Sequence, residues 1–263
     1  MALGDILREF QAPIEARGFG RAVAFDGQFL YLTRVGDRNI HRVTTTGTFV
    51  SSIPTRIDYG ALKFDSTEGV FWAGGFEGTS DIDKISISGD EAAVLDTINY
   101  SDTVPLDPDD RFPGFVSGIT VDPATDTLFF STNLGGSVYN IRKDGSFISS
   151  FQTPPQDGFS SRVTGVESDG INLWLNLVIN LGNEFNDVRV YTVQTDTAGN
   201  ETSNRFLSGT GFEVTEDLEF DNITFAPRCA LWSNEGSFGG TGIRAFVIPC
   251  PGRYSFLRDL SRR

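Results

Sequence analysis

The sequence is poor in the residues on which many catalytic and metal sites depend. Its 263 residues include one histidine, His41, and two cysteines, and its only lysines are Lys63, Lys84 and Lys143. A single histidine excludes a pair of catalytic histidines and a metal site with three histidine ligands. A Ser-His-Asp triad would have to use His41, and the chain lacks the GxSxG segment that carries a nucleophilic serine in one large group of hydrolases.

Long hydrophobic runs and an excess of basic charge are also missing. No run of 18 apolar residues is present, so we expect no membrane-spanning helix. The N-terminus lacks the basic and then apolar pattern of a signal peptide. The net charge of -14 repels the phosphates of nucleic acids and anionic membranes, so we expect neither as a partner. The C-terminal tail, residues 251–263, is a basic tip that would pack as a short helix or fray.

The sequence does contain a repeat. Five segments share the pattern small–apolar–x–apolar–Asp, although Ser168 and Asp217 depart from it. They are AVAFD (22–26), ALKFD (61–65), GITVD (118–122), GVESD (165–169) and DLEFD (217–221). A second strand with a central aromatic residue follows each segment, and then a third strand. Strand-like units repeated every 35–60 residues are typical of stacked β units.

A fourth strand ends four of the units but not the last. The missing strand is found at the start of the chain, where GDILREFQAP (4–13) resembles GSFISSFQTP (145–154). We therefore predict that the N-terminal strand pairs into the last unit and closes a ring without free sheet edges. A β-sandwich would not explain this match. Residues 98–117 are too rich in proline and aspartate to supply a sixth unit.

The predicted fold is an all-β, five-bladed β-propeller of four-stranded antiparallel blades, forming a single domain. The closing strand covers residues 4–13, and the blades cover about 18–54, 57–97, 114–154, 161–209 and 214–250.

The two cysteines lie on neighbouring strands of the last blade. A hairpin centred between Gly239 and Gly240 would place Cys229 opposite Cys250, close to disulfide range. We therefore predict a disulfide, which indicates an extracellular or periplasmic location. Two buried free thiols are the alternative.

The aspartates that end the first strands are better explained as residues that cap turns than as a ring of metal ligands. Each one precedes a turn, where an aspartate caps its own backbone. These residues are Asp26, Asp65, Asp122, Asp169 and Asp221. His41 shares its third-strand position with unrelated side chains in the other blades, so we interpret it as structural.

Each connection between blades carries an aromatic residue. These residues are Phe19, Tyr59, Phe115, Phe159 and Phe212. They would form either an aromatic rim at one mouth of the channel, suited to sugar rings or apolar ligands, or plugs between neighbouring blades.

Polar side chains are expected near the same mouth. Asn133, Asn176, Asn234 and Asp217 offer oxygen ligands of the kind that suit Ca²⁺, which makes calcium the candidate cofactor. The aspartate-rich loop at residues 102–110 and the segment NEFND (183–187) lack EF-hand spacing, and we interpret them as solvated loops.

Residues 115–151 resemble one blade of the NHL, SMP-30/gluconolactonase-like and SdiA-regulated propeller families. The shared features are GITVDP, a short turn, an aromatic strand, a glycine turn, VYNI and DGS. In the gluconolactonase-like group the resemblance implies a divalent metal at the channel mouth, held by Glu, Asn and Asp. Those families typically have six blades, and Arg21-Ala22 stands here where their early metal-binding glutamate is expected. A shared fold does not transfer function.

The hypothesis favoured by these features is a non-catalytic binding or scaffold propeller. It would recognise a glycan, a peptide or a protein surface through the aromatic-rimmed channel face. The alternatives are a metal-dependent hydrolase or lactonase and a structural component of a surface assembly.

Overall fold

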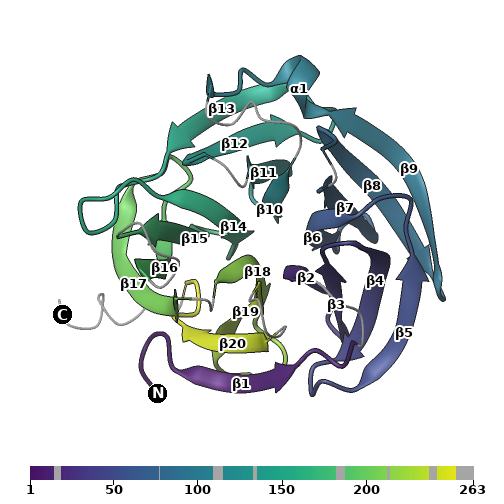
Figure 1. The fold of residues 1–263 in the computed structure, drawn as a ribbon, viewed down its shortest axis with the longest axis horizontal. Coiled ribbons are helices and arrows are strands. Elements are labelled where there is room, and N and C mark those ends of the chain that lie inside the picture. Colours follow the sequence, from purple (N-terminus) through teal and green to yellow (C-terminus); the bar gives the residue numbers. More distant parts are fainter. Residues whose placement is uncertain are drawn as a thin grey trace, which may run out of the picture.

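The computed structural model describes residues 1–14, 19–76, 78–108, 115–132, 135–181, 187–211, 214–236 and 242–252. In these residues the chain forms five four-stranded antiparallel sheets arranged in a ring (Figure 1). The predicted five-bladed β-propeller is confirmed. No helix in the described ranges is long and apolar enough to cross a membrane.

Each blade is built from the axis outwards. The innermost strands are β2 (Gly20–Phe25), β6 (Tyr59–Asp65), β10 (Val116–Asp122), β14 (Arg162–Ser168) and β18 (Thr215–Asp221). The second strands are β3 (Phe29–Arg34), β7 (Val70–Gly75), β11 (Thr127–Thr132), β15 (Leu173–Asn180) and β19 (Cys229–Glu235).

The outer half of each blade follows the same order. The third strands are β4 (Asp37–Thr44), β8 (Asp81–Ser88), β12 (Ser137–Arg142), β16 (Val188–Thr195) and β20 (Gly242–Ile248). The outermost strands are β5 (Phe49–Pro54), β9 (Glu91–Asn99), β13 (Phe147–Gln152), β17 (Glu201–Thr210) and, in the last blade, β1 (Ile6–Gln11). One short helix, α1 (Tyr100–Thr103), follows β9.

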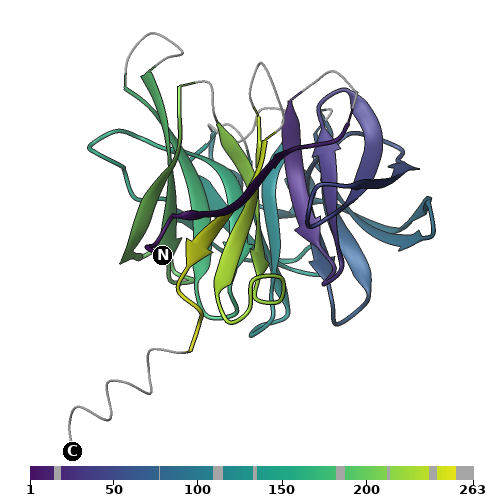
Figure 2. The same ribbon diagram turned by 90° about the horizontal axis from the view of Figure 1, so that it is seen from below.

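The N-terminal strand closes the ring as the sequence predicted. Strand β1 pairs antiparallel with β20, from Ile6 opposite Phe246 to Gln11 opposite Gly242. In the side view of Figure 2 it crosses the strands of the last blade. The Phe10 ring packs edge-on against Trp232, with 6.2 Å between ring centroids, so β1 adds to the core as well as to the sheet.

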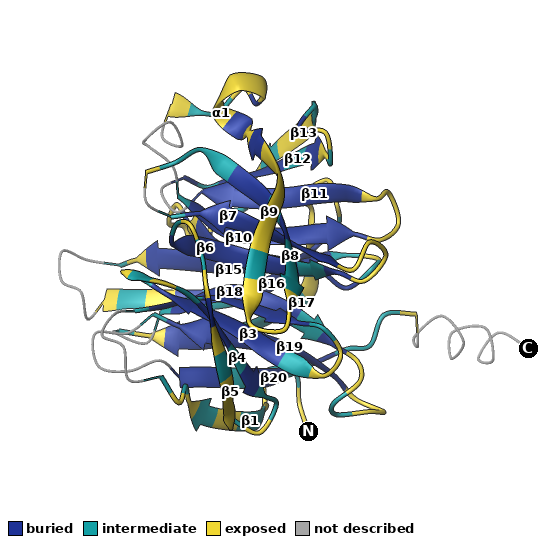
Figure 3. Ribbon diagram, turned by 90° about the vertical axis from the view of Figure 1, so that its right-hand side faces the viewer, coloured by how far each residue is buried: buried dark blue, intermediate teal, exposed yellow. Residues whose placement is uncertain are grey.

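The core lies between the blades. Five clusters of buried apolar residues occur in the described residues, each joining two neighbouring blades. The central aromatics of the second strands are buried in or beside them, and Trp72, Trp174 and Trp232 are among the largest fully buried side chains. Figure 3 shows that the inner strands are buried, whereas β5 and β9 have exposed stretches. Stability therefore comes from blade-to-blade packing around the whole ring.

The innermost strands approach one another closely around the axis. A Cβ atom on Gly118 would lie 2.3 Å from the backbone nitrogen of Val166, and one on Gly165 would lie 2.5 Å from the carbonyl oxygen of Glu216. This contact explains why the first position of the repeat is small in four of the five blades.

The five repeat aspartates cap their turns, as predicted. Each Oδ1 atom accepts a backbone N–H two residues later, as in the 2.8 Å bonds from Gln28 to Asp26 and from Ile223 to Asp221. In three blades the second oxygen accepts a bond from the second-strand aromatic. These bonds join Tyr31 to Asp26 (2.8 Å), Trp174 to Asp169 (3.0 Å) and Trp232 to Asp221 (2.8 Å). Each of these aspartates therefore ties its turn to the core.

The predicted disulfide is present, but the predicted hairpin register was wrong. Cys229 pairs across the sheet with Ile248, two residues before the expected partner. Cys250 lies beyond the end of β20, outside the ladder, and its Cα atom is 5.1 Å from that of Cys229. The bond therefore fastens the end of the last blade to its second strand.

Replacing both cysteines (C229A/C250A) should lower the free energy of unfolding by about 3 kcal/mol, because the unfolded chain loses a 21-residue cross-link. In a chain of this size that loss corresponds to a fall of roughly 6 °C in Tm. Scanning calorimetry measures the change. A reductant should lower the Tm of the wild type by a similar amount and leave the variant unchanged, and an equal effect on both would contradict the prediction.

Candidate functional site

One position of the repeat brings charged residues to a cavity on the axis. It is the third residue of the five-residue pattern, and it is occupied by Ala24, Lys63, Thr120, Glu167 and Glu219. Lys63, Glu167 and Glu219 line the cavity, whereas Ala24 packs in the apolar cluster between blades 1 and 2. All five residues are buried on innermost strands. Four of them are polar although the residues on either side in the same strands are mostly apolar. This layer is therefore the first place to look for a site.

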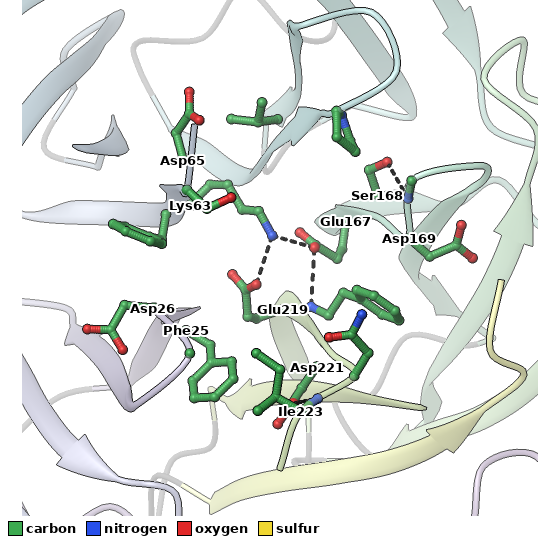
Figure 4. Close-up of a pocket in the computed structure, with 18 of the residues that line it drawn as sticks. Phe25, Asp26, Lys63, Asp65, Glu167, Ser168, Asp169, Glu219, Asp221 and Ile223 are labelled. Carbon is green, nitrogen blue, oxygen red and sulfur yellow. Dashed lines mark hydrogen bonds and ion pairs between the residues drawn. The ribbon is translucent and has the colours of Figure 1, made fainter. Parts of the chain in front are cut away.

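Three residues of the layer form a charged cluster. The Lys63 Nζ atom lies 2.5 Å from Glu167 Oε1 and 2.8 Å from Glu219 Oε1. Figure 4 shows the lysine reaching between the two glutamates from the opposite side of the channel. The backbone N–H of Phe220 also donates to Glu167 Oε1 at 3.2 Å. The second oxygens of both glutamates are buried and have no partner with good hydrogen-bond geometry among the described residues. The Thr120 side chain still favours the ionised form of Glu167, and the Phe25 backbone favours that of Glu219.

Burial controls the protonation of this cluster. It raises the pKa of Glu167, and the Lys63 ammonium opposes that effect. Burial also raises the pKa of Glu219 well above its usual value; Lys63 opposes this rise and the Glu167 carboxylate adds to it. Burial alone would lower the pKa of Lys63, but the two carboxylates outweigh it and the net shift is upwards. The cluster therefore pairs one firmly charged ammonium with two carboxyl groups that hold protons unusually well.

Two more buried carboxyl groups continue along β18. Asp217 stands where the repeat otherwise has a small residue, and its oxygens accept the backbone N–H groups of Leu62 at 3.2 Å and Leu218 at 3.0 Å. Burial raises its pKa well above the usual value, despite these bonds. Next to it, burial raises the pKa of Glu216, although Arg21 lies 2.9 Å away. Acidic side chains thus extend from the cluster towards the other mouth of the channel.

A cavity opens at the cluster. Its volume is about 390 Å³, and it lies at the end of the channel formed by the turns between first and second strands. Apolar side chains on its walls include Phe25, Phe64, Val121, Phe220 and Ile223, and the cluster also lines it (Figure 4). The cavity is of a size for a small molecule.

The four predicted aromatic residues that the structure describes lie away from this cavity and in different environments. Tyr59 is buried, and its hydroxyl donates to Asp83 at 2.6 Å, so this side chain belongs to the interior. Phe115 is half-buried, with its ring centroid 4.7 Å from that of Phe76. Phe19 is also half-buried, and Phe159 is 41% exposed. Phe212 lies outside the described residues. Ligand binding by this set stays a prediction.

The predicted metal ligands are mostly engaged with the protein. Asn176 donates to the Glu216 carbonyl at 2.5 Å and accepts from Thr192 at 2.7 Å. Asn234 donates to the Ala22 carbonyl at 2.9 Å, and its own oxygen has no partner in the described part of the chain. Both Asp217 oxygens accept backbone N–H groups, and Asn133 lies outside the described residues. The described members do not fit a metal ion as a set, so no step is assigned to one and calcium stays a prediction.

His41 is buried in β4. Both ring nitrogens are hydrogen-bonded, Nδ1 to Ser52 Oγ at 2.9 Å and Nε2 to Asp37 Oδ2 at 2.7 Å. The histidine therefore lies apart from the central cluster, on the outer half of the first blade.

No motif in the sequence predicts the central cluster, although the repeat carries a signal for it. The third repeat position varies between blades, and its alignment puts Lys63, Glu167 and Glu219 in one column. Charged residues in a column between buried apolar positions indicate a shared polar environment. The alignment does not show that these three side chains face the channel.

Comparisons with known proteins support the fold alone. No protein-family model matches the chain, and no curated protein matches it in sequence. A glutaminyl cyclase from Myxococcus xanthus superposes with a TM-score of 0.62 at 12% identity, over 94% of this chain and 97% of that one. The tail fibre of Staphylococcus aureus phage P68 superposes with a TM-score of 0.54 at 14% identity, over 98% of this chain and 56% of the fibre chain. The resemblance to NHL and gluconolactonase-like propellers is not confirmed beyond the fold.

The raised pKa of Glu219 has a measurable effect on stability. Above about pH 4.3, the ordinary pKa of a glutamate, the unfolded chain releases a proton that the folded protein retains. This group therefore stabilises the fold most at low pH, and its contribution is lost as the pH rises through the folded pKa. Glu219→Gln should remove that loss, so its stability relative to wild type should increase as the pH rises above about 4.3. Urea unfolding at several pH values measures it.

Glu68 provides a control of opposite sign. Hydrogen bonds from Lys143 and Lys84 lower its pKa, so its contribution is present above the ordinary pKa and is lost at low pH. Glu68→Gln should therefore lose stability relative to wild type as the pH rises. The same trend in both variants would contradict the assignment.

Proposed function

We propose that the protein binds a small organic cation in its central cavity, with Glu167 and Glu219 receiving the charged group. The observation that carries this proposal is the charge of the lining. Six carboxylate residues line the cavity, and Lys63 is the one cationic side chain among the lining residues that the structure describes. A cavity lined with one sign of charge concentrates ligands of the other sign.

The two glutamates are the groups best placed to receive the cation. The turn aspartates around the cavity already accept backbone N–H groups. Lys63 occupies one oxygen of each glutamate and leaves the second oxygen of each without a described partner. A buried acceptor without a partner gains more from a new hydrogen bond than a solvated one does. Two such oxygens suit an ammonium group.

The side chains on the cavity walls indicate the chemistry of the rest of the ligand. Phe25, Phe64 and Phe220 line the cavity beside the charged cluster. Aromatic rings favour an apolar or aromatic body, and their faces attract a cation. A primary amine attached to an aromatic ring combines both properties.

Phenethylamine and phenylacetate test the proposal, because they share a ring and differ in the sign of their charge. We expect phenethylamine to bind in calorimetry and to raise Tm, whereas phenylacetate should do neither. At about 100 times its Kd a ligand adds about 2.7 kcal/mol to stability. Glu219→Gln should weaken amine binding by about tenfold or more, because a bound ammonium group favours the ionised form of Glu219 and an amide cannot ionise.

Glu68→Gln is the matched control, since it removes a carboxylate outside the cavity lining. Its affinity for phenethylamine should equal that of the wild type. Equal binding of the amine and the acid, or no binding of the amine at millimolar concentration, would contradict the proposal.

An acid–base enzyme acting in the same cavity is the second candidate, and the raised pKa values of Glu167 and Glu219 favour it. A carboxyl group with a raised pKa keeps its proton to a higher pH and can donate it, and an ionised neighbour can accept one. The Myxococcus protein of this fold is a glutaminyl cyclase, so the first substrate to test is a peptide with an N-terminal glutamine. Mass spectrometry would detect the cyclised product. Loss of conversion in Glu219→Gln but not in Glu68→Gln supports this candidate, and no conversion by the wild type contradicts it without affecting the binding proposal.

The face that carries Phe115 remains the candidate for a glycan, peptide or protein partner. The Arg21 guanidinium lies 4.5 Å from the centre of the Phe76 ring, which packs in turn on Phe115. If no small cation binds, Phe115→Ala in a glycan-array experiment tests this face. A structural role in an assembly is favoured if neither face binds a ligand.

A further inference from the structure

The outer half of blade 1 holds a second polar arrangement that the proposed function does not use. His41 on β4 and Ser52 on β5 are direct partners across the sheet. The Nδ1 atom of His41 lies 2.9 Å from Ser52 Oγ, and its Nε2 atom lies 2.7 Å from Asp37 Oδ2. The other oxygen of Asp37 accepts a hydrogen bond from Asn39 at 2.5 Å. None of these residues lines the central cavity.

The carboxylate determines which ring nitrogen carries the proton. An ionised carboxylate only accepts hydrogen bonds, so Nε2 of the neutral ring must carry the hydrogen that Asp37 receives. Nδ1 then has a free lone pair directed at Ser52, and the serine hydroxyl must donate to it. A hydroxyl held against the basic nitrogen of an oriented imidazole is the arrangement that activates a serine nucleophile.

The sheet exposes this serine. Ser52 is exposed, whereas His41 is 4% exposed. The Thr55 N–H donates to the Arg38 carbonyl at 2.9 Å, and hydrogen-bonded pairs alternate along an antiparallel ladder. His41 and Ser52 therefore form a non-hydrogen-bonded pair. In such a pair the side chains lie closer together, and the backbone N–H and C=O groups of each residue point away from the partner strand. Pro54, which has no N–H, occupies the same type of position two residues later.

The backbone of Ser52 adds a hydrogen-bond donor. Strand β5 is the outermost strand of its sheet, so the Ser52 N–H faces the open edge. When Oγ attacks a carbonyl group, the negative oxygen that develops needs such a donor. The nucleophile, its base, the residue that orients the base and one donor are thus present on two neighbouring strands.

We propose that Ser52 is a nucleophile that accepts acyl groups from small activated esters, with His41 as its base and Asp37 as a positioning residue. The Oγ atom forms a bond to the ester carbonyl carbon while its proton moves to His41 Nδ1. The carbon–oxygen bond to the alcohol breaks, and Nδ1 returns the proton to the departing oxygen. Water then adds to the acyl group, one of its protons passes through Nδ1 to Ser52 Oγ, and the carboxylic acid leaves.

Blade 3 offers a matched control within the same molecule. Ser150 on β13 is also exposed and also lies opposite a third-strand residue, but that residue is Tyr139. Ser150 therefore has a similar place on an outermost strand without a basic partner. A difference in reactivity between the two serines measures the effect of His41.

The experiment treats the full chain with diisopropyl fluorophosphate and locates the adduct by peptide mass spectrometry. We expect one adduct on Ser52 and none on Ser150, slowed by at least about tenfold in Asp37→Asn and abolished in His41→Gln. Hydrolysis of p-nitrophenyl acetate should be lost in Ser52→Ala and unchanged in Ser150→Ala. The comparison of the two serines uses the folded wild type, so an unstable variant cannot hide the result. No adduct on Ser52, or equal labelling of both serines, would overturn the proposal.

Discussion

The close approach of the five innermost strands around one axis is the constraint on which the rest of the structure depends. Backbones come so near that Gly118 and Gly165 have no room for a side chain towards the neighbouring strand. The second and fourth positions of the repeat mostly pack apolar side chains between blades. In three blades the third position faces the central cavity instead. Because the strands lie so close together, Lys63 comes within hydrogen-bonding distance of both Glu167 and Glu219.

A contribution to the stability of the fold is a poor explanation for the burial of Lys63 between two glutamates. Ions lose their hydration when they are buried, and replacing a buried ion pair by apolar residues of similar volume is often neutral or stabilising. In blade 1 the equivalent residue, Ala24, is fully buried in the apolar cluster between blades 1 and 2. Lys63, Glu167 and Glu219 line the cavity instead, which favours a role in binding or proton transfer over a role in stability.

The fold could be predicted from the sequence because its features are local and repeated. The pentapeptide, its turn aspartate and the matching N-terminal strand each need only neighbouring residues or a comparison of segments. The candidate site was harder to predict from the sequence. That Lys63 meets Glu167 and Glu219 depends on which side of three distant strands faces the axis. The partners of His41 depend on the register between β4 and β5, and register is also where the cysteine prediction was wrong by two residues.

Among the described residues, the last blade combines closure of the ring with the largest share of the buried acidic side chains. Strand β18 carries Glu216, Asp217, Glu219 and Asp221, all of them buried. Like charges in a low-dielectric channel repel one another and would spread if the strand could move. In this blade the first and last described strands, β1 and β20, pair in one sheet, and a disulfide joins its second strand to the residues after its third. Sheet hydrogen bonds between β1 and β20 thus close the ring, and the disulfide braces the same blade, where the acidic strand lies. Such support provides the preorganisation that a binding or catalytic carboxyl group requires.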